Sequence, residues 1–574
     1  MSGSATPRPS PALARVRAYR PPRHGAPIDL RLDGNEAAGP GPELLAALER
    51  AGPDALRRYP DPAALERRLA ERLGIGPARV LVTAGADDGL ERALRAVLAP
   101  GRNLVLPVPT FEMLERYARL AGAEVVPVPW LDGPFPRAAL RAAAGPETAA
   151  LAIVSPNNPT GATADPADVE RLATELPGVL LLADLAYVEF ADADPTARLL
   201  ALPNVVVFRT FSKAWGLAGL RVGWAAGPAG IIEWLRAAGH PYAVSRPSLA
   251  LAEARLERDG AAVARFVERV REERTALAER LERLGVACAP SQANFLLVRT
   301  PRAAWLHDAL AGLGIAVRRF PERPELADRL RITLPGDPTA FDRLCRALEA
   351  ALRPAALLFD IDDTLVDVSR SYRRAIRATV ESFGGRCDDA DVAALRLAGD
   401  ANNDWELSRR LLARQGIERT LAEVTDRFER FYQGSGAGDG FREAETLRVP
   451  RERLARWAAR LPLGLVTGRP RRDADVFLAR YDLGPLFRAA TVMEDGPRKP
   501  DPDPVRRVLA ALGVRNAWMV GDTPDDVRAA RAAGVVPIGV AAPGEEFART
   551  ADALTAAGAA RVLRDLAELE ELLP

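Results

Sequence analysis

The chain contains only two lysines, Lys213 and Lys499, among 574 residues, and the remaining 76 of its 78 basic residues are arginines. Arginine stays protonated in proteins and cannot attack a carbonyl group. A lysine amine, by contrast, can lose its proton and form an imine. A lysine retained in so arginine-rich a chain is therefore a candidate for chemistry that arginine cannot perform.

The surroundings of Lys213 favour a cofactor site. It lies in "RTFSKAWGL", after an apolar strand pattern and before "GLAGLRVGW", whose glycines permit close backbone approach and whose Arg221 can hold an anion. This arrangement predicts a Schiff base between Lys213 and pyridoxal phosphate. Such a site also needs an acid for the pyridine nitrogen, a donor to the ring hydroxyl, a stacking ring and helix-start amides for the phosphate.

Candidates for these roles follow one another at predicted strand ends. They are Ala86 and Asp87 in "TAGADD", Phe111 in "PTF", Asn158 in "SPNNPTG", Asp184 and Tyr187 in "DLAY", and Ser212 in "RTFSK". Taken singly, "SPNNPTG" is typical of an ordinary turn and Asp184 of a helix cap. Independent loops would rarely supply all the roles together, so the whole set favours the cofactor site.

A second group of residues has the pattern of phosphoryl transfer. "LLFDIDDTLVD" places Asp360 and Asp362 just past an apolar strand, where the amides of a tight turn can cradle a phosphate. One carboxylate can attack phosphorus to form an aspartyl phosphate, while the other protonates the leaving group and then activates water. Two adjacent carboxylates also favour Mg²⁺, which suits an all-oxygen site shared with phosphate. A hydroxyl, a cation and further carboxylates follow at later strand ends as Thr467, Lys499, Asp522 and Asp526.

The elements that must position these residues read as α/β throughout. Short apolar runs alternate with amphipathic helical patterns between residues 28 and 350, which indicates a mostly parallel, helix-covered sheet. The predicted strands are "RVLVTAG", "NLVLPVP", "EVVPVP", "ALAIVSP", "VLLLADLAY" and "NVVVFRTFS". A helical stretch over 249–284, interrupted at Gly260, begins a smaller subdomain, expected over about 245–350 together with an N-terminal segment.

The strand pattern restarts after Pro354, so a domain boundary is predicted near residue 352 and a second domain over 353–574. Its predicted strands are "AALLFD", "LGLVTG", "AATVMED", "AWMVGD" and "VVPIGV". Residues 369–450 are mainly helical with a glycine-rich break and are expected to form a cap. Within this cap, Asn402, Asn403, Asp404 and Trp405 are unusually polar and aromatic for a helix start, which favours a role in substrate binding over plain capping.

The composition limits the binding partners and the cellular compartment expected for the chain. A formal net charge of +1 and interspersed charges give no basic field for nucleic acid or a membrane surface, and no apolar run reaches the roughly 18 residues of a membrane span. Cys288, Cys345 and Cys387 are widely spaced and have no CxxC pattern, which is typical of a reducing cytoplasm. Residues 1–27 are expected to be a disordered tail; their Arg and Ser content leaves an organelle transit peptide as the alternative.

With these motifs in place, residues 15–345 resemble the fold type I aminotransferases, and within them the histidinol-phosphate aminotransferases. The marks are "AYRPP", "LDGNEAAGP", "RYPDP", "SQANFLLV", "GIAVR" and "RITLPG". The resemblance implies that Asp184 pairs with the pyridine nitrogen and that Tyr187 and Asn158 contact the ring hydroxyl. It assigns the phosphate to Ala86, Asp87, Ser212 and Arg221, and stacking to Phe111.

The resemblance also implies a substrate site and a partner. Arg331, with Arg318 and Tyr19, would hold the anionic end of the substrate, and Tyr59 would reach the phosphate of a neighbouring subunit, giving a homodimer. The chain has "NEA", "DLAY", Phe111 and "RITLPG" where the family usually has "NEN", "DEAY", a tyrosine and "RITVG". An aminotransferase for aromatic or other amino acids, or a phosphothreonine-type decarboxylase, therefore stays open.

Residues 355–574 resemble the haloacid dehalogenase superfamily of phosphatases. The resemblance implies that Asp360 is the nucleophile and Asp362 the acid/base, that Thr467 and Lys499 bind the phosphoryl group, and that Mg²⁺ is bound by Asp360, Asp522 and the backbone carbonyl of Asp362, with Asp526 in support. If the first domain makes histidinol phosphate from imidazole-acetol phosphate and glutamate, a phosphatase acting on it would perform the next step of histidine biosynthesis. The alternatives are a phosphatase for unrelated small phosphoesters and a regulatory or binding protein without turnover.

Overall fold

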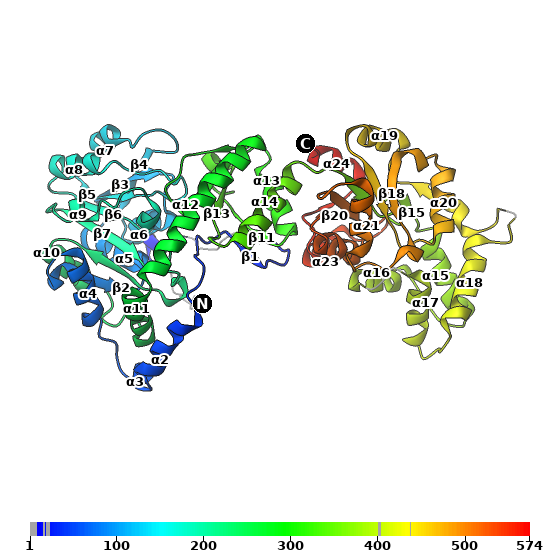
Figure 1. Cartoon of the computed structure of the whole chain (residues 1–574), viewed down its shortest axis with the longest axis horizontal. Coiled ribbons are helices and arrows are strands. Elements are labelled where there is room, and N and C mark those ends of the chain that lie inside the picture. Colours follow the sequence, from blue (N-terminus) through cyan, green and yellow to red (C-terminus); the bar gives the residue numbers. More distant parts are fainter. Residues whose placement is uncertain (1–8, 15, 17, 19–22, 400–402, 437) are drawn as a thin grey trace, which may run out of the picture. The chain divides into compact units, whose positions relative to one another are not determined.

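The computed structural model describes residues 9–14, 16, 18, 23–399, 403–436 and 438–574. The chain divides into two compact units. Unit 1 comprises residues 1–22, 32–301 and 318–341, and unit 2 comprises residues 23–31, 302–317 and 342–574. Each unit is built around its own sheet with helices on both sides (Figure 1).

Unit 1 contains a seven-stranded sheet in the order β2-β8-β7-β6-β5-β3-β4. Its strands are β2 (Val80–Thr83), β3 (Asn103–Val108), β4 (Glu124–Pro129), β5 (Thr148–Val154), β6 (Leu180–Asp184), β7 (Val205–Thr210) and β8 (Gly223–Ala226). The six strands predicted from the sequence are confirmed, and the sheet is mostly parallel. Strand β8 was missed: it is antiparallel to both β2 and β7, and three of the four residues of its "GWAA" are Gly or Ala, which are depleted in strands.

Helices cover this sheet because their apolar faces pack on it. Leu90 of α5, Leu114 of α6 and Leu235 of α10 share one core with Leu182 of β6 and Phe208 of β7. The helices around the sheet are α4 (Ala63–Leu73), α5 (Ala86–Val97), α6 (Glu112–Leu120), α7 (Arg137–Ala143), α8 (Pro166–Glu175) and α10 (Ala229–Ala237). The carboxyl ends of the parallel strands thus meet at one edge, where ligands bind in open α/β sheets.

Unit 1 also holds a smaller, antiparallel sheet in the order β12-β13-β10-β9. Its strands are β9 (Ala287–Cys288), β10 (Phe295–Arg299), β12 (Arg318–Arg319) and β13 (Arg329–Thr333). The helical stretch predicted over 249–284 is confirmed as α11 (Arg246–Arg258) and α12 (Gly260–Arg283), which are separate helices that meet at Asp259.

Unit 2 contains a parallel six-stranded sheet in the order β18-β17-β14-β19-β20-β21. The strands are β14 (Leu357–Phe359), β17 (Leu463–Val466), β18 (Phe487–Thr491), β19 (Trp518–Gly521), β20 (Val536–Val540) and β21 (Arg561–Leu563). Five of them match the predicted strands, and the short β21 was missed. The covering helices are α19 (Arg451–Arg460), α20 (Arg471–Arg480), α21 (Asp503–Leu512), α22 (Pro524–Ala532), α23 (Phe547–Ala557) and α24 (Leu569–Leu572).

A helical segment is inserted after β14, as predicted for the cap. It contains α15 (Tyr372–Ser382), α16 (Asp389–Ala398), α17 (Asp404–Ala413) and α18 (Leu421–Gln433). The chain enters through β15 (Val366–Asp367) and returns through β16 (Thr446–Leu447), and these two strands pair antiparallel. The cap is therefore joined to the sheet by one two-stranded ribbon, the cap ribbon.

The predicted boundary near residue 352 coincides with the end of helix α14 (Pro338–Leu352), and the predicted extents of the domains stay a prediction. Inside unit 2, the end of α14 packs on tryptophans: Trp518 donates from Nε1 to the Ala350 carbonyl at 2.8 Å, and Trp305 of α13 (Ala303–Gly312) donates to the Ala351 carbonyl at 2.9 Å. Among the described residues, none of the helices is both long and apolar enough to cross a membrane. All three cysteines are free.

Candidate active sites

Lys213 lies in the turn that follows β7, at the carboxyl edge of the seven-stranded sheet. Its Nζ donates one hydrogen bond, to the Gly34 carbonyl at 3.1 Å, and lies 5.6 Å from the centre of the Tyr187 ring. The side chain is only partly buried. Lys213 is thus held loosely, by a neutral backbone group, and its amine remains accessible for reaction.

Asp184 ends strand β6 and is almost fully buried, with 4% of its surface exposed. Its Oδ1 accepts a hydrogen bond from the Ala186 amide at 3.1 Å. Burial raises the pKa of the Asp184 carboxyl to about 7, and the positive charge of Lys213 acts in the opposite direction. A protonated pyridine nitrogen is the kind of cationic partner that would restore this buried carboxylate to its charged form.

A hydrogen-bonded network links the end of β6 to the small sheet. The Tyr187 hydroxyl accepts from Asn35 Nδ2 at 3.0 Å, and Asn35 Oδ1 accepts from Thr333 Oγ1 at 2.9 Å. Arg331 of β13 donates to Asn158 Oδ1 at 2.5 Å and to the Asp33 carbonyl at 2.5 Å. Asn158, Tyr187 and Arg331 are therefore connected through β13 and the end of β6.

Asn35 is a residue to which the sequence alone assigned no role. It is 1% exposed and adopts a positive φ of 54°, and its carbonyl accepts from Asn294 Nδ2 at 3.2 Å. Such a conformation in a residue other than glycine is costly and persists where surrounding contacts enforce it. The asparagine in "LDGNEA" was the signal, because asparagine tolerates this conformation better than most residues.

The predicted phosphate end is built where β2 turns into α5. Ala86 is the first residue of α5, and Gly85 before it has φ of +84°, where a Cβ would lie 2.6 Å from Arg221 Nη2. Arg221 donates to Ser212 Oγ at 3.2 Å and to Asp87 Oδ2 at 3.1 Å. The amides of a helix start, a guanidinium and a hydroxyl can together bind an anion. This donor set, with Asp184 and Lys213, fits pyridoxal phosphate.

The remaining predicted residues of unit 1 lie in different settings. Phe111 is the N-cap residue of α6 and packs on the sheet core, and Arg318 donates to Glu112 Oε1 at 3.4 Å. Tyr59 is 77% exposed and stacks on Tyr242, with ring centres 4.5 Å apart. Tyr19 lies outside the described residues.

In unit 2, Asp360 directly follows β14 and is 5% exposed. Its Oδ1 accepts from Lys499 Nζ at 2.7 Å, and Lys499 also donates to the Val466 carbonyl at 3.1 Å and to Asp526 Oδ1. Burial raises the pKa of the Asp360 carboxyl to about 7 despite Lys499. Burial alone would lower the pKa of Lys499, but the carboxylates of Asp360 and Asp526 raise it above its ordinary value.

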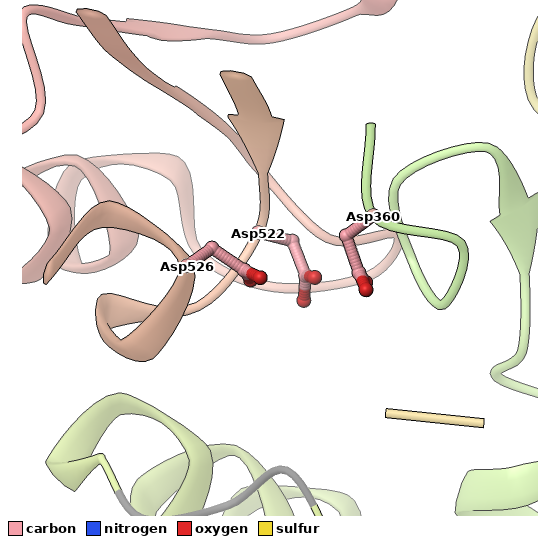
Figure 2. Close-up of side chains that lie close together, drawn as sticks. All are labelled: Asp360, Asp522 and Asp526. Atoms are coloured by element: carbon pink, nitrogen blue, oxygen red, sulfur yellow. The ribbon is translucent and has the colours of Figure 1, made fainter. Parts of the chain in front are cut away.

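Three carboxylates converge at the carboxyl edge of this sheet. Asp360, Asp522 and Asp526 each place one oxygen within 4.8 Å of the other two (Figure 2). Burial also raises the pKa of Asp522. A buried all-carboxylate group fits a hard divalent cation such as Mg²⁺, which takes oxygen ligands and would offset the charge. The side chain of Asp362 is not in this group.

Asp362 instead faces an arginine that the sequence reading left without a role. Arg469, from "LVTGR", is 2% exposed and donates from Nε and Nη2 to Asp362 Oδ1 at 2.8 and 2.6 Å. It also donates to both oxygens of Glu445, at 3.1 and 3.3 Å. Glu445 adjoins the cap ribbon and further accepts from Ser371 and Tyr432 at 3.1 Å. Nearby, Thr467 Oγ1 accepts from the Arg469 amide at 3.2 Å.

A second buried arginine comes from the cap. Arg396 of α16 donates to Asp363 Oδ2 and to Asp522 Oδ2, and Arg373 of α15 donates to Asp363 Oδ2 at 2.7 Å. Burial acts to raise the pKa of Asp363, but Arg396 and Arg373 outweigh it and hold that pKa below its usual value. These pairs could not be predicted from the sequence, because 76 arginines offer too many candidate partners.

Residues 403–405, the described part of the cap stretch that the sequence singled out, differ from one another in what they contact. Asn402 lies outside the described residues. Asn403 is the N-cap of α17, since its Oδ1 accepts from the amides of Trp405 and Glu406 at 3.1 and 3.3 Å. Asn403, Asp404 and Trp405 also line a pocket together with Asp360 and Asp362.

The chain matches two protein families. Residues 30–348 match the aminotransferase class I and II family, and residues 354–534 match the haloacid dehalogenase-like hydrolases. The histidinol-phosphate aminotransferase of Acetobacter pasteurianus is 36% identical over 353 residues, which cover 60% of this chain and 96% of that protein. An imidazoleglycerol-phosphate dehydratase of Phytophthora nicotianae is 41% identical over 228 residues, 38% of this chain and 50% of that protein.

A solved structure agrees with the first match. Histidinol-phosphate aminotransferase from Sinorhizobium meliloti, in complex with pyridoxal-5'-phosphate, superposes with a TM-score of 0.56 at 29% identity, covering 61% of this chain and 99% of that one. Both matched families are enzymes, and each match falls on one of the sites described above. The chain therefore belongs to the class I and II aminotransferases, which use pyridoxal phosphate. C-terminal to the aminotransferase region it carries a haloacid dehalogenase-like hydrolase domain.

Proposed function

We propose that this bifunctional enzyme catalyses two consecutive steps of histidine biosynthesis. The first site would transfer an amino group from glutamate to imidazole-acetol phosphate, giving histidinol phosphate and 2-oxoglutarate. The second would hydrolyse histidinol phosphate to histidinol. The observation that carries the proposal is the pairing, in one chain, of a Lys213 site with histidinol-phosphate aminotransferase relatives and a separate phosphoryl site around Asp360.

In the first site, the cofactor would supply an electron sink for the carbon that loses its proton. Asp184 would keep the pyridine nitrogen protonated, and Asn158 and Tyr187 would contact the ring hydroxyl. Lys213 Nζ, when deprotonated, would take the proton from the α-carbon of the substrate. Its hydrogen bond to a neutral carbonyl supports this role, because among the described residues no ion pair ties up the amine.

The other residues of the first site would bind and orient. Ala86, Asp87, Ser212 and Arg221 would hold the phosphate of the cofactor, with Phe111 against its ring. Arg331, which already bonds Asn158, would bind the anionic end of the substrate together with Arg318 and Tyr19.

In the second site, Asp360 would attack phosphorus and become an aspartyl phosphate. Asp362 would protonate the leaving oxygen and then deprotonate the water that releases phosphate. Lys499 and Thr467 would bind the phosphoryl oxygens, while Asp360, Asp522 and the Asp362 carbonyl would hold Mg²⁺ with support from Asp526. Mg²⁺ would neutralise charge on the phosphoryl oxygens.

The surroundings of Tyr59 support a homodimer through unit 1. Tyr59 and Leu56 are 77% and 83% exposed, which is unusual for large apolar side chains of one small segment. Tyr59 would reach the cofactor phosphate of the partner. Three free cysteines and small polar substrates support a cytoplasmic enzyme.

Each half of the proposal has a direct assay with purified full-length protein. With pyridoxal phosphate, glutamate and imidazole-acetol phosphate, we expect 2-oxoglutarate and histidinol phosphate in equal amounts. Carbon dioxide release from phosphothreonine instead would favour a decarboxylase. With Mg²⁺, phosphate release from histidinol phosphate should exceed that from phosphoglycolate or p-nitrophenyl phosphate. A rate no higher than for those generic esters would contradict the pathway assignment.

A further inference from the structure

Asp404 differs from the other acids that line the phosphatase pocket, because within the described residues no ion pair reaches it, whereas Asp360, Asp362 and Asp522 each have one. It is the first residue of α17 and lines the pocket with Asp360 and Asp362. Within the described part of the chain, no hydrogen bond or ion pair reaches its carboxylate. The neighbouring Asn403 serves as the helix cap, so Asp404 is not needed for that purpose.

The arginines beside Asp404 are already engaged. Arg396 bridges Asp363 and Asp522, and Arg469 bridges Asp362 and Glu445. Each guanidinium is thus shared between two carboxylates before Asp404 is counted. Burial, followed by the like charge of Asp362, raises the pKa of the Asp404 carboxyl to about 7. An acid in such surroundings is short of positive charge, which a bound ligand can supply.

We infer that Asp404 is a specificity-determining residue that binds the ammonium group of an amino-alcohol phosphate. Asp404 and Asp362 line the same pocket. Asp362 is the residue assigned to the leaving oxygen. The amine should therefore lie on a carbon close to the ester oxygen, as in a 2-amino alcohol phosphate. This inference rests on the phosphatase function proposed above.

An amine-binding Asp404 would make the product of the first site the preferred substrate of the second. A 2-amino alcohol phosphate is formed when an oxo group beside a phosphorylated carbon is exchanged for an amine, which is the transamination assigned to the Lys213 site. The oxo compound has no ammonium group, and Asp404 would face it with a negative charge alone. The pocket would thus favour the product of the first site over its substrate and limit premature loss of phosphate.

The residues that follow Asp404 on α17 are held in place by hydrogen bonds to their neighbours. Trp405 is fixed by a hydrogen bond from its Nε1 to Glu429 Oε1 at 3.1 Å. Glu406, the next acid on α17, does not line the pocket and pairs with Arg409 at 2.9 Å. It offers a matched control, since Asp404→Asn and Glu406→Gln remove the same charge from the same helix turn.

The test compares histidinol phosphate with its des-amino analogue, 3-(imidazol-4-yl)propyl phosphate, in full-length protein with Mg²⁺. Wild type and Glu406→Gln should prefer the amine in kcat/KM. Asp404→Asn should lower kcat/KM for histidinol phosphate by about 10- to 100-fold, as for a lost charged hydrogen bond, and leave the analogue unchanged. Equal losses on both compounds, or no wild-type preference, would overturn the inference.

A binding measurement keeps the inference separate from the phosphatase assignment. Calorimetric titration of the Asp360→Asn variant with each compound measures the difference in Kd between them without turnover. In the double variant that also carries Asp404→Asn, this difference should disappear. A preference that depends on Asp404 without any turnover in wild type would retain the amine site and reject the phosphatase. Turnover without that preference would retain the phosphatase and reject the amine site.

Discussion

Each of the two lysines lies in a loop that follows a parallel strand, Lys213 after β7 and Lys499 after β18, but their surroundings are opposite. Lys213 is partly buried and donates to one backbone carbonyl. Lys499 is 5% exposed and is fixed by Asp360, Asp526 and the Val466 carbonyl. Among the described residues, Lys213 has no ion pair, although its charge acts on the Asp184 carboxyl, whereas Lys499 forms two ion pairs. This contrast suits a lysine proposed to lose its proton and a lysine proposed to remain a cation.

The largest expected effect comes from Lys213→Arg. Arginine retains the charge but cannot be deprotonated, so transamination should fall by about a thousandfold or more. Amino transfer from glutamate measures the loss. Phosphate release by the same variant serves as the control and should equal that of wild type.

Lys499→Arg should be less damaging, because that role requires only a cation. The larger head must fit where Lys499 Nζ already bridges two carboxylates, so phosphate release should fall by about 10- to 100-fold, with transamination intact. Steady-state phosphate release from histidinol phosphate measures it. If the two lysine variants lost equal fractions of their activities, the contrast between a reactive and a charge-bearing lysine would not hold.

Arg469→Met sharpens the comparison within the second site. Losing the bonds from Arg469 to Asp362 should slow hydrolysis of alkyl phosphates by about tenfold and p-nitrophenyl phosphate less, since that leaving group needs little protonation. The pH profile of kcat should shift as well. Arg471→Met, at an exposed arginine paired with Asp495, is the control. Equal losses on both esters would assign Arg469 a purely structural role.

The smallest effect concerns Asp184 and the stability of the cofactor-free protein. Because burial raises the pKa of this carboxyl from 3.8 to about 7, the folded state binds its proton more tightly than the unfolded state. The stability contribution is therefore full below pH 4 and lost as the pH rises to 7. Relative to Asp184→Asn, wild type should lose about 2 to 4 °C in Tm between pH 4 and 8. Parallel Tm curves would contradict this reading.

Much of the fold was readable because strand ends and motifs coincide. The apolar runs before Asp184, Lys213 and Asp360 marked the strands, and the candidate site residues lie just after them. Strand β8 escaped detection because "GWAA" has no strand pattern, and β21 because its "RVL" begins with a charged residue and leaves only two apolar ones. The partners of Asp362 and Asp363 were equally hidden, since long-range pairing selects Arg469 and Arg396 from 76 arginines.

We propose that the two sites act one after the other, and a single incubation tests this order most directly. Purified protein with pyridoxal phosphate, Mg²⁺, glutamate and imidazole-acetol phosphate is followed for histidinol phosphate, histidinol and phosphate. We predict histidinol from wild type, histidinol phosphate alone from Asp360→Asn, neither product from Lys213→Arg, and histidinol again when the two variants are mixed. Failure of wild type to form histidinol, or of the mixture to restore it, would contradict the account.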